Sequence, residues 1–266
     1  MKEELSFGDF KPFLNIEVRD KVAVIRFTDD IIDIALDLDV IGRLWDLLQK
    51  LSTSTKIAAV LFVGTKSCFS PQRADKFWQE FREQYKSTSG NLSETQKQRI
   101  AREQNAMCRF ISAIRDCPKP VLMALQGQVT APFLGISLAC DSRIICDDTV
   151  FHIRTHKIGL PPIGGLAYFL PLYLGWGKAN RFLMETEKIE AKQALEIGLV
   201  DQVTAVHILE HTAFEHAQAL AQKPPESISA IKKLLNTHFR GMGAYFDSER
   251  EAINTALNKL WTHKTM

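Results

Sequence analysis

Residues 118–165 have the sequence PKPVLMALQGQVTAPFLGISLACDSRIICDDTVFHIRTHKIGLPPIGG, which carries most of the information about the fold. Residues 121–125 form a continuous apolar run of strand length, and residues 136–140 continue as an apolar segment that favours a buried helix. Residues 143–146 predict a second strand, and the glycines and prolines of 158–165 predict a turn. Uninterrupted apolar strands are typical of a parallel sheet covered on both faces, so this stretch predicts an α/β fold.

The preceding residues show the same alternation of strand and helix. Residues 13–17 and 22–27 are short apolar runs joined by a polar turn, which predicts a hairpin. Residues 39–51 place apolar side chains at the three- and four-residue spacing of an amphipathic helix, and residues 56–63 predict a buried strand. Crossovers between such parallel strands are expected to be right-handed.

The remaining segments predict a polar lobe and a helical C-terminal region. Residues 77–101 are rich in Gln, Glu, Lys and Arg and predict a surface lobe. A helical pattern over residues 95–114 overlaps the end of this lobe. We expect a core over residues 1–203 and a helical region over 204–266. Further helices are predicted at 167–174, 178–184, 191–198, 205–222, 227–237 and 245–261.

Composition narrows the possible functions. The 266 residues include 33 basic and 31 acidic side chains with a net charge of +2, and no block of one sign suggests a nucleic-acid surface. Five cysteines without paired spacing predict reduced core thiols, not a disulfide framework or a metal site. No segment approaches about 18 uncharged apolar residues. We therefore expect a soluble, cytoplasmic protein without a membrane, nucleic-acid or metal partner.

Several local motifs resemble those of the crotonase (enoyl-CoA hydratase/isomerase) superfamily and follow its order over roughly residues 13–203. The 191–201 segment, AKQALEIGLVD, is the strongest single match. The resemblance implies a ClpP/crotonase-like spiral of ββα units, with a C-terminal helical region that mediates trimer contacts. The other motifs are 22–27 with Ala35-Leu36, Phe69-Ser70 before Ala74-Asp75, 119–121, Cys140-Asp141, and Ile158-Gly159 with Pro162.

The resemblance also implies a site that holds a thioester carbonyl between two backbone N–H groups, an oxyanion hole. Counted along the family motif, the first donor falls on Arg73, or on Ala74 if one residue is inserted. The second donor position falls on Pro132, which has no backbone N–H. Because the first turn of a helix exposes several N–H groups, a shift of one residue would let Phe133 or Leu134 replace it.

The same counting places the two glutamates of the family hydratases at Gly135 and Thr155, where no carboxylate is present. His152 and His156 flank Thr155, and an imidazole can act as an acid or base, although a surface or subunit contact is the ordinary interpretation for both. Ordinary hydration is therefore disfavoured. Three functions remain open: an enoyl-CoA hydratase/isomerase-like enzyme with non-standard catalytic residues, a catalytically impaired acyl-CoA binder or structural partner of an active paralogue, and a CoA-thioester or C–C bond hydrolase.

The ligand implied by the resemblance is an acyl-CoA, with the CoA thioester as substrate and no other cofactor. Its adenine end is expected near Ala35 and Ala74, and the assembly is expected to be a homotrimer or a dimer of trimers. The Arg73 side chain could bind a CoA phosphate, or it could be a solvent-exposed cation of the loop, and the sequence favours neither role. Structural roles are the expectation for Asp141, at the end of the central helix, and for Ser137, which lacks a nucleophile elbow.

Overall fold

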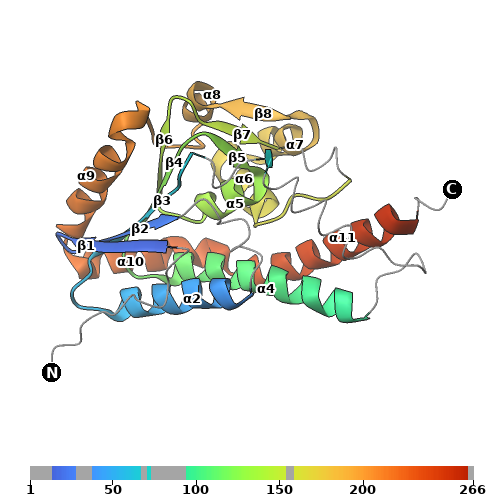
Figure 1. Ribbon diagram of the computed structural model, residues 1–266, viewed down its shortest axis with the longest axis horizontal. Coiled ribbons are helices and arrows are strands. Elements are labelled where there is room, and N and C mark those ends of the chain that lie inside the picture. The colour runs from blue at the N-terminus through green and yellow to red at the C-terminus, as the bar shows by residue number, and fades with distance from the viewer. Residues whose placement is uncertain (1–13, 28–37, 67–70, 73–93, 154–158, 263–266) are drawn as a thin grey trace.

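The computed structural model describes residues 14–27, 38–66, 71–72, 94–153 and 159–262, and its helices and strands are shown in Figure 1. Of the predicted site residues, Ala35, Arg73, Ala74, Thr155 and His156 lie outside these ranges. The polar lobe predicted at 77–101 lies largely outside them as well. Phe133, His152 and Gly135 lie within them.

A six-stranded sheet forms the centre of the fold, with the order β1-β2-β3-β4-β6-β9. β1 and β2 pair antiparallel through a tight turn in which Asp20 and Lys21 have φ of 49° and 63°, as a two-residue hairpin turn requires. Each later neighbour pairs parallel. The strands are β1 (Leu14–Arg19), β2 (Val22–Phe27), β3 (Ala59–Val63), β4 (Val121–Leu125), β6 (Ser142–Cys146) and β9 (Gln202–Thr204).

Helices cover both faces of this sheet. Val60 and Phe62 of β3 belong to the core cluster that includes residues of α2 (Leu38–Thr53) and α4 (Glu94–Asp116). Leu61, on the opposite face of β3, packs in a second cluster with residues of α9 (Leu209–Ala221). Figure 1 shows α9 on one side of the strands and α2 with α4 on another. The prediction of a parallel sheet buried on both faces is confirmed, since alternate residues of one strand enter separate cores.

A second, three-stranded sheet carries the helix predicted at 136–140. It has the order β5-β7-β8, formed by β5 (Gln128–Thr130), β7 (Val150–His152) and β8 (Lys188–Glu190). The helix, α5 (Ala131–Leu138), begins directly after β5, so the apolar pattern placed its start five residues late, whereas the family motif places Pro132 correctly in its first turn. The physical reason is Pro132, which fits a first helical turn because its missing N–H has no intrahelical partner there.

The C-terminal part is helical, as predicted. Gly198, with φ of 76°, follows α8 as a left-handed terminating residue. Figure 1 shows α11 extending beyond α10 in the same layer as α2 and α4. The helices are α6 (Leu166–Leu174), α7 (Trp176–Glu185), α8 (Ala191–Glu196), η3 (Val206–Ile208), α9, α10 (Pro225–Leu235), η4 (Asn236–Phe239) and α11 (Met242–Thr262). Within the described ranges, no helix combines the length and hydrophobicity needed to cross a bilayer.

A buried arginine joins the end of α5 to β6 and β9. The side chain of Arg143 is 2% exposed and donates to the carbonyl oxygens of Leu199 at 2.8 Å and of Cys140 at 3.0 Å. It also donates to the carbonyl oxygen of Ser137 at 3.2 Å, and its backbone N–H donates to the Asp201 carboxylate at 2.6 Å. Arg143 therefore supplies additional donors to carbonyl groups at and just beyond the end of α5, where a helix offers few N–H partners.

Candidate active site

The start of α5 is the element on which the predicted oxyanion hole depends. Thr130 is the N-cap residue and makes no side-chain cap, and Pro132 occupies the first turn without an N–H. Phe133 follows Pro132 in the same turn and carries the N–H predicted for the second donor position. Seven of the eight residues of α5 are buried, so this turn is held rigidly by packing on all sides.

Two glycines bring the first turn of α5 against the turn that precedes α6. A Cβ atom added to Gly135 would lie 2.3 Å from the carbonyl oxygen of Gly164. A Cβ atom added to Gly164 would lie 2.6 Å from the carbonyl oxygen of Pro132. Gly164 has φ of 76°, a conformation that favours glycine. The position to which the family motif assigns a glutamate is thus occupied by the backbone of another segment, and no side chain fits there in this arrangement.

Glu249 of α11 contacts the same glycine turn from the C-terminal helix. Its Oε1 accepts the N–H of Gly164 at 3.1 Å, and its Oε2 accepts the N–H of Gly165 at 3.1 Å. The hydroxyl of Tyr245, one turn earlier in α11, donates to Oε2 at 2.8 Å. Burial raises the pKa of the Glu249 carboxyl group, and the three hydrogen bonds oppose this rise without cancelling it. A carboxyl group that sequence counting did not find is therefore next to the predicted site.

Aromatic packing fixes α11 against α6 around this contact. The ring centroids of Tyr168 and Tyr245 lie 5.2 Å apart, and those of Tyr245 and Phe246 lie 5.6 Å apart. A Cβ atom on Gly165 would meet the ring of Phe169 at 2.8 Å and that of Phe246 at 3.5 Å. These distances suit the offset and edge-to-face contacts that aromatic pairs prefer, so Glu249 sits on a well-anchored part of α11.

His152 lies at the end of β7, paired in register with Thr130, the residue that caps α5. Its Nε2 is hydrogen-bonded to the Oε1 of Gln128 on β5, and the side chain is partly exposed. Its neighbour Phe151 points into the main core. The structure thus places His152 beside Thr130 at the start of α5 and pairs its ring with the Gln128 amide, and its role in proton transfer stays a prediction.

Asp141 and Ser137 have the structural contacts that we expected. Asp141 Oδ2 accepts the N–H of Val121 at 2.8 Å and the ammonium group of Lys232 at 2.5 Å. Lys232 is 5% exposed and also donates to a backbone carbonyl, so its charge depends on Asp141 for compensation. Ser137 is fully buried and donates to the carbonyl oxygen of Leu134 at 2.7 Å. Neither side chain is available as a catalytic group.

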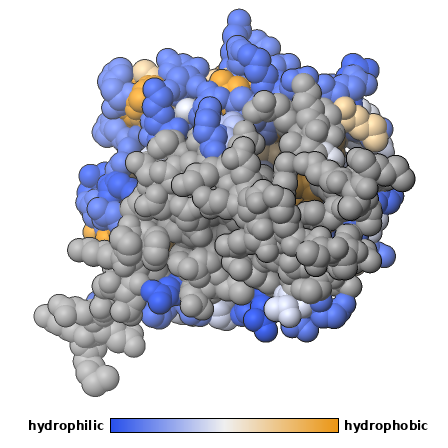
Figure 2. Space-filling model, turned by 45° about the vertical axis from the view of Figure 1, so that its right-hand side comes forward, coloured by the Kyte–Doolittle hydropathy of each residue, from blue (hydrophilic) through white to orange (hydrophobic). Residues whose placement is uncertain are grey.

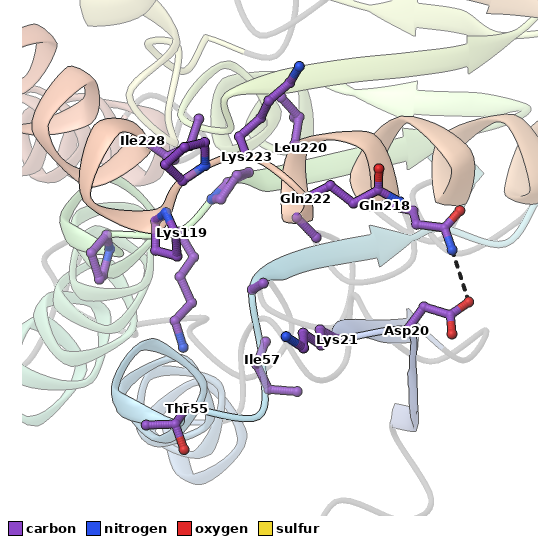
Figure 3. Close-up of a pocket in the computed structure, with 16 residues that line it drawn as sticks. Asp20, Lys21, Thr55, Ile57, Lys119, Gln218, Leu220, Gln222, Lys223 and Ile228 are labelled. Carbon is purple, nitrogen blue, oxygen red and sulfur yellow. Dashed lines mark hydrogen bonds between the residues drawn. The ribbon is translucent and has the colours of Figure 1, made fainter.

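A pocket of about 650 Å³ lies at the opposite end of the sheet, as Figure 3 shows. Its lining includes Lys21, Ala58 and Pro120, which immediately precede β2, β3 and β4. Lys119 also lines it, but its ammonium group already donates to the carbonyl oxygens that end α2. Ligands of open parallel sheets bind at the carboxyl ends of the strands, where β4 leads into β5 and α5. This pocket is therefore not the candidate active site.

Three kinds of comparison bear on this geometry. Residues 17–259 match the family model described as enoyl-CoA hydratase/isomerase. The chain is 28% identical to the YngF protein of Bacillus subtilis (strain 168) over 202 residues, which is 76% of this chain and 73% of that protein. It is 33% identical over 146 residues to the fatty acid oxidation complex subunit alpha of Shewanella loihica, covering 53% of this chain but only 20% of the subunit.

The fold is matched over almost the whole chain. The crystal structure of enoyl-CoA hydratase from Bacillus halodurans superposes with a TM-score of 0.79 at 19% identity, covering 95% of this chain and 98% of that one. At 19% sequence identity, this similarity shows a shared backbone fold and nothing further about function. It agrees with the spiral of ββα units expected from the sequence motifs, and with the helical C-terminal region.

Proposed function

The chain belongs to the enoyl-CoA hydratase/isomerase family, and on this basis we propose that it binds an acyl-CoA thioester and acts on it by proton transfer without ordinary hydration. The observation that carries the proposal is the contact between Gly135 and Gly164, which leaves 2.3 Å between a Cβ atom and a carbonyl oxygen. Hydration needs a carboxyl group to activate water or deliver a proton, and such groups contribute roughly 10²- to 10⁴-fold each.

The thioester cradle that we propose uses backbone donors. Arg73 or Ala74 supplies one N–H, and Phe133 supplies the other from the first turn of α5. Ala35 and Ala74 hold the adenine end of CoA. Enolate stabilisation by two such donors requires no side chain, so the cradle is compatible with Pro132 in the first turn of α5.

A catalytically impaired acyl-CoA binder is the alternative supported by the same glycine contact. Incubation with crotonyl-CoA, followed by the loss of the conjugated thioester absorbance, separates it from a hydratase, and titration calorimetry with butyryl-CoA measures binding alone. We expect saturable butyryl-CoA binding and slow or no hydration. Rapid hydration of crotonyl-CoA would refute the assignment of Gly135, and absence of binding to either thioester would refute the proposed function itself.

We also propose a homotrimer or a dimer of trimers. Large apolar side chains are exposed on α6, α7 and α10, including Trp176 at 78% and Leu234 at 70%. Figure 2 shows a few hydrophobic side chains among hydrophilic ones along the upper edge of the molecule. Exposed apolar surface of this kind supports burial against a second copy. Analytical ultracentrifugation tests the assembly, and a monomer at micromolar concentration would refute it.

The location that we propose is the cytoplasm. The described cysteines are free thiols, which suits a reducing compartment. They are Cys108, Cys117, Cys140 and Cys146.

A further inference from the structure

Glu249 joins the C-terminal helix to the turn that packs on α5. Its two carboxylate oxygens accept the N–H groups of Gly164 and Gly165 at 3.1 Å each, across 85 and 84 residues of sequence. Gly164 in turn lies against Pro132, since a Cβ atom on this glycine would be 2.6 Å from the Pro132 carbonyl oxygen. Glu249 and the first turn of α5 therefore both contact Gly164.

The surroundings of Glu249 keep its proton affinity high. Burial raises the pKa of this carboxyl group, and among the described residues no basic side chain forms an ion pair with it. The neighbouring Arg250 is engaged by Asp247 and by Asn105. A carboxyl group in an apolar setting without a cationic partner is the environment that prepares catalytic acids and bases for neutral pH.

In the described part of the chain, two other titratable groups face Glu249, and both remain neutral near pH 7. Tyr245, on the same helix, donates its hydroxyl to Oε2, and burial followed by the Glu249 charge raises the pKa of the phenol. Cys108 approaches from α4, and burial with the Glu249 charge raises the pKa of its thiol to about 12. Of these three groups, Glu249 is the one whose ordinary pKa lies in the acidic range, and burial moves that pKa upward.

A purely structural role explains the position of Glu249 less well. Two backbone N–H groups can be satisfied by a neutral amide or hydroxyl oxygen, without the cost of holding a carboxylate in an apolar site. The raised pKa records that cost, because burial outweighs the three donors. A carboxyl group adds to these hydrogen bonds the capacity to exchange a proton, which a neutral amide or hydroxyl oxygen lacks.

We propose that Glu249 is the proton-transfer residue of the acyl-CoA site, supplied by the C-terminal helix in place of the carboxyl group that Gly135 does not carry. This inference rests on the proposed function. The ionised carboxylate takes a proton from the carbon next to the thioester, and the C–H electron pair moves onto the carbonyl oxygen to form an enolate. The same carboxyl group then returns the proton to that carbon. In a β,γ-unsaturated thioester, where the anion is a dienolate, it returns the proton to the γ-carbon as the double bond moves to the α,β position, so that no oxidant, reductant or water is consumed.

The test uses the full-length protein and butyryl-CoA, a saturated thioester that cannot be hydrated. Exchange of its α-protons in D₂O is followed by mass spectrometry, and its binding by calorimetry. We expect Glu249→Gln to slow exchange by roughly 10²-fold or more while the dissociation constant stays within about threefold. The control is Glu251→Gln, an exposed acid on the same helix, which should exchange at the wild-type rate.

A pH profile separates proton transfer from support of the fold. Exchange should rise with pH as Glu249 ionises, with a midpoint above 4.5, the ordinary pKa of the group. Tyr245→Phe removes a hydrogen bond that lowers the Glu249 pKa, so its midpoint should move to higher pH, an effect that loosened packing alone does not produce.

The outcomes separate the two proposals. Wild-type binding with exchange that survives in Glu249→Gln overturns the role of Glu249 and leaves the acyl-CoA function intact. Binding without any exchange in the wild type also overturns the role of Glu249 and favours a binder. Absence of butyryl-CoA binding overturns both.

Discussion

Restoring a side chain at position 135 tests whether the glycine contact excludes the family carboxyl group. Gly135→Ala adds a single Cβ atom, which would lie 2.3 Å from the carbonyl oxygen of Gly164, 2.9 Å from its carbonyl carbon and 3.0 Å from the nitrogen of Leu166. All three atoms belong to the backbone, so a rotamer change cannot relieve the contact. The two segments must separate, or α5 must shift.

Two opposing effects set the change that Gly135→Ala makes in the free energy of unfolding. Replacing glycine by alanine inside a helix favours folding by about 1 kcal/mol. Overpacking of a buried site costs roughly 1–3 kcal/mol, and contact with rigid backbone places Gly135 at the upper end. The net loss is then about 2 kcal/mol. At about 2–4 °C for each kcal/mol in a protein of this size, the melting temperature should fall by roughly 4–8 °C.

Gly177→Ala is the matched control, because Gly177 is also helical and an added Cβ atom meets no atom within 4 Å. Differential scanning calorimetry should show this variant at or above the wild-type melting temperature, since only the helix preference of up to about 1 kcal/mol remains. Gly135→Glu should be less stable than Gly135→Ala and should not hydrate crotonyl-CoA. A stable Gly135→Ala variant, or a Gly135→Glu variant that hydrates crotonyl-CoA, would refute the reasoning.

Three further measurements address the buried polar groups. Arg143→Lys should cost about 1–3 kcal/mol for each buried carbonyl left without a donor, measured by urea unfolding against the exposed control Arg181→Lys. Asp141→Ala should cost about 3–5 kcal/mol, because the Lys232 charge stays buried without its partner; recovery in a double variant with Lys232→Met checks the cause. The raised pKa of Glu249 means that its contribution to stability is present below pH 4.5 and is lost as the pH rises through the folded-state pKa. Wild type should therefore lose stability relative to Glu249→Gln as the pH rises above 4.5, and a difference independent of pH would contradict this.

The elements that sequence patterns predicted are those whose signal is local and repeated. β3 and β4 are five-residue runs in which every residue is buried, and these runs are apolar throughout. The second sheet was missed because its strands have three residues, too few for an alternating pattern to emerge. β8 (Lys188–Glu190) has one buried residue between two exposed ones, in what the sequence indicates only as a connection between helices.

The start of α5 was located by the family motif but misplaced by the apolar pattern, because two of its residues normally interrupt helices. Pro132 and Gly135 favour a turn when only their neighbours are considered. The structure gives each a separate reason: Pro132 occupies a first turn that needs no N–H, and Gly135 admits the carbonyl of Gly164. The second reason depends on a contact 29 positions away, which no local pattern contains.

Glu249 was missed for a related reason. In an amphipathic helix an acid is expected on the solvent side, and the segment around it has acids and bases on several sides. The available signal was the spacing of Tyr245 and Glu249, four residues apart and therefore on one helical face, beside the aromatic Phe246. That spacing places a hydrogen-bond donor next to the acid, but it does not reveal that Gly164 and Gly165 complete the site.

Gly135 and Glu249 both depend on the position of the turn that contains Gly164. The backbone of Gly164 can rest on α5 only where residue 135 has no side chain, and in that position its N–H points to the carboxylate of α11. A side chain at 135 would require the turn to move, and the two N–H groups that Glu249 accepts belong to that same turn. The absence of a side chain at 135 and the position of the Glu249 carboxyl group therefore depend on one placement of this turn in the present structure.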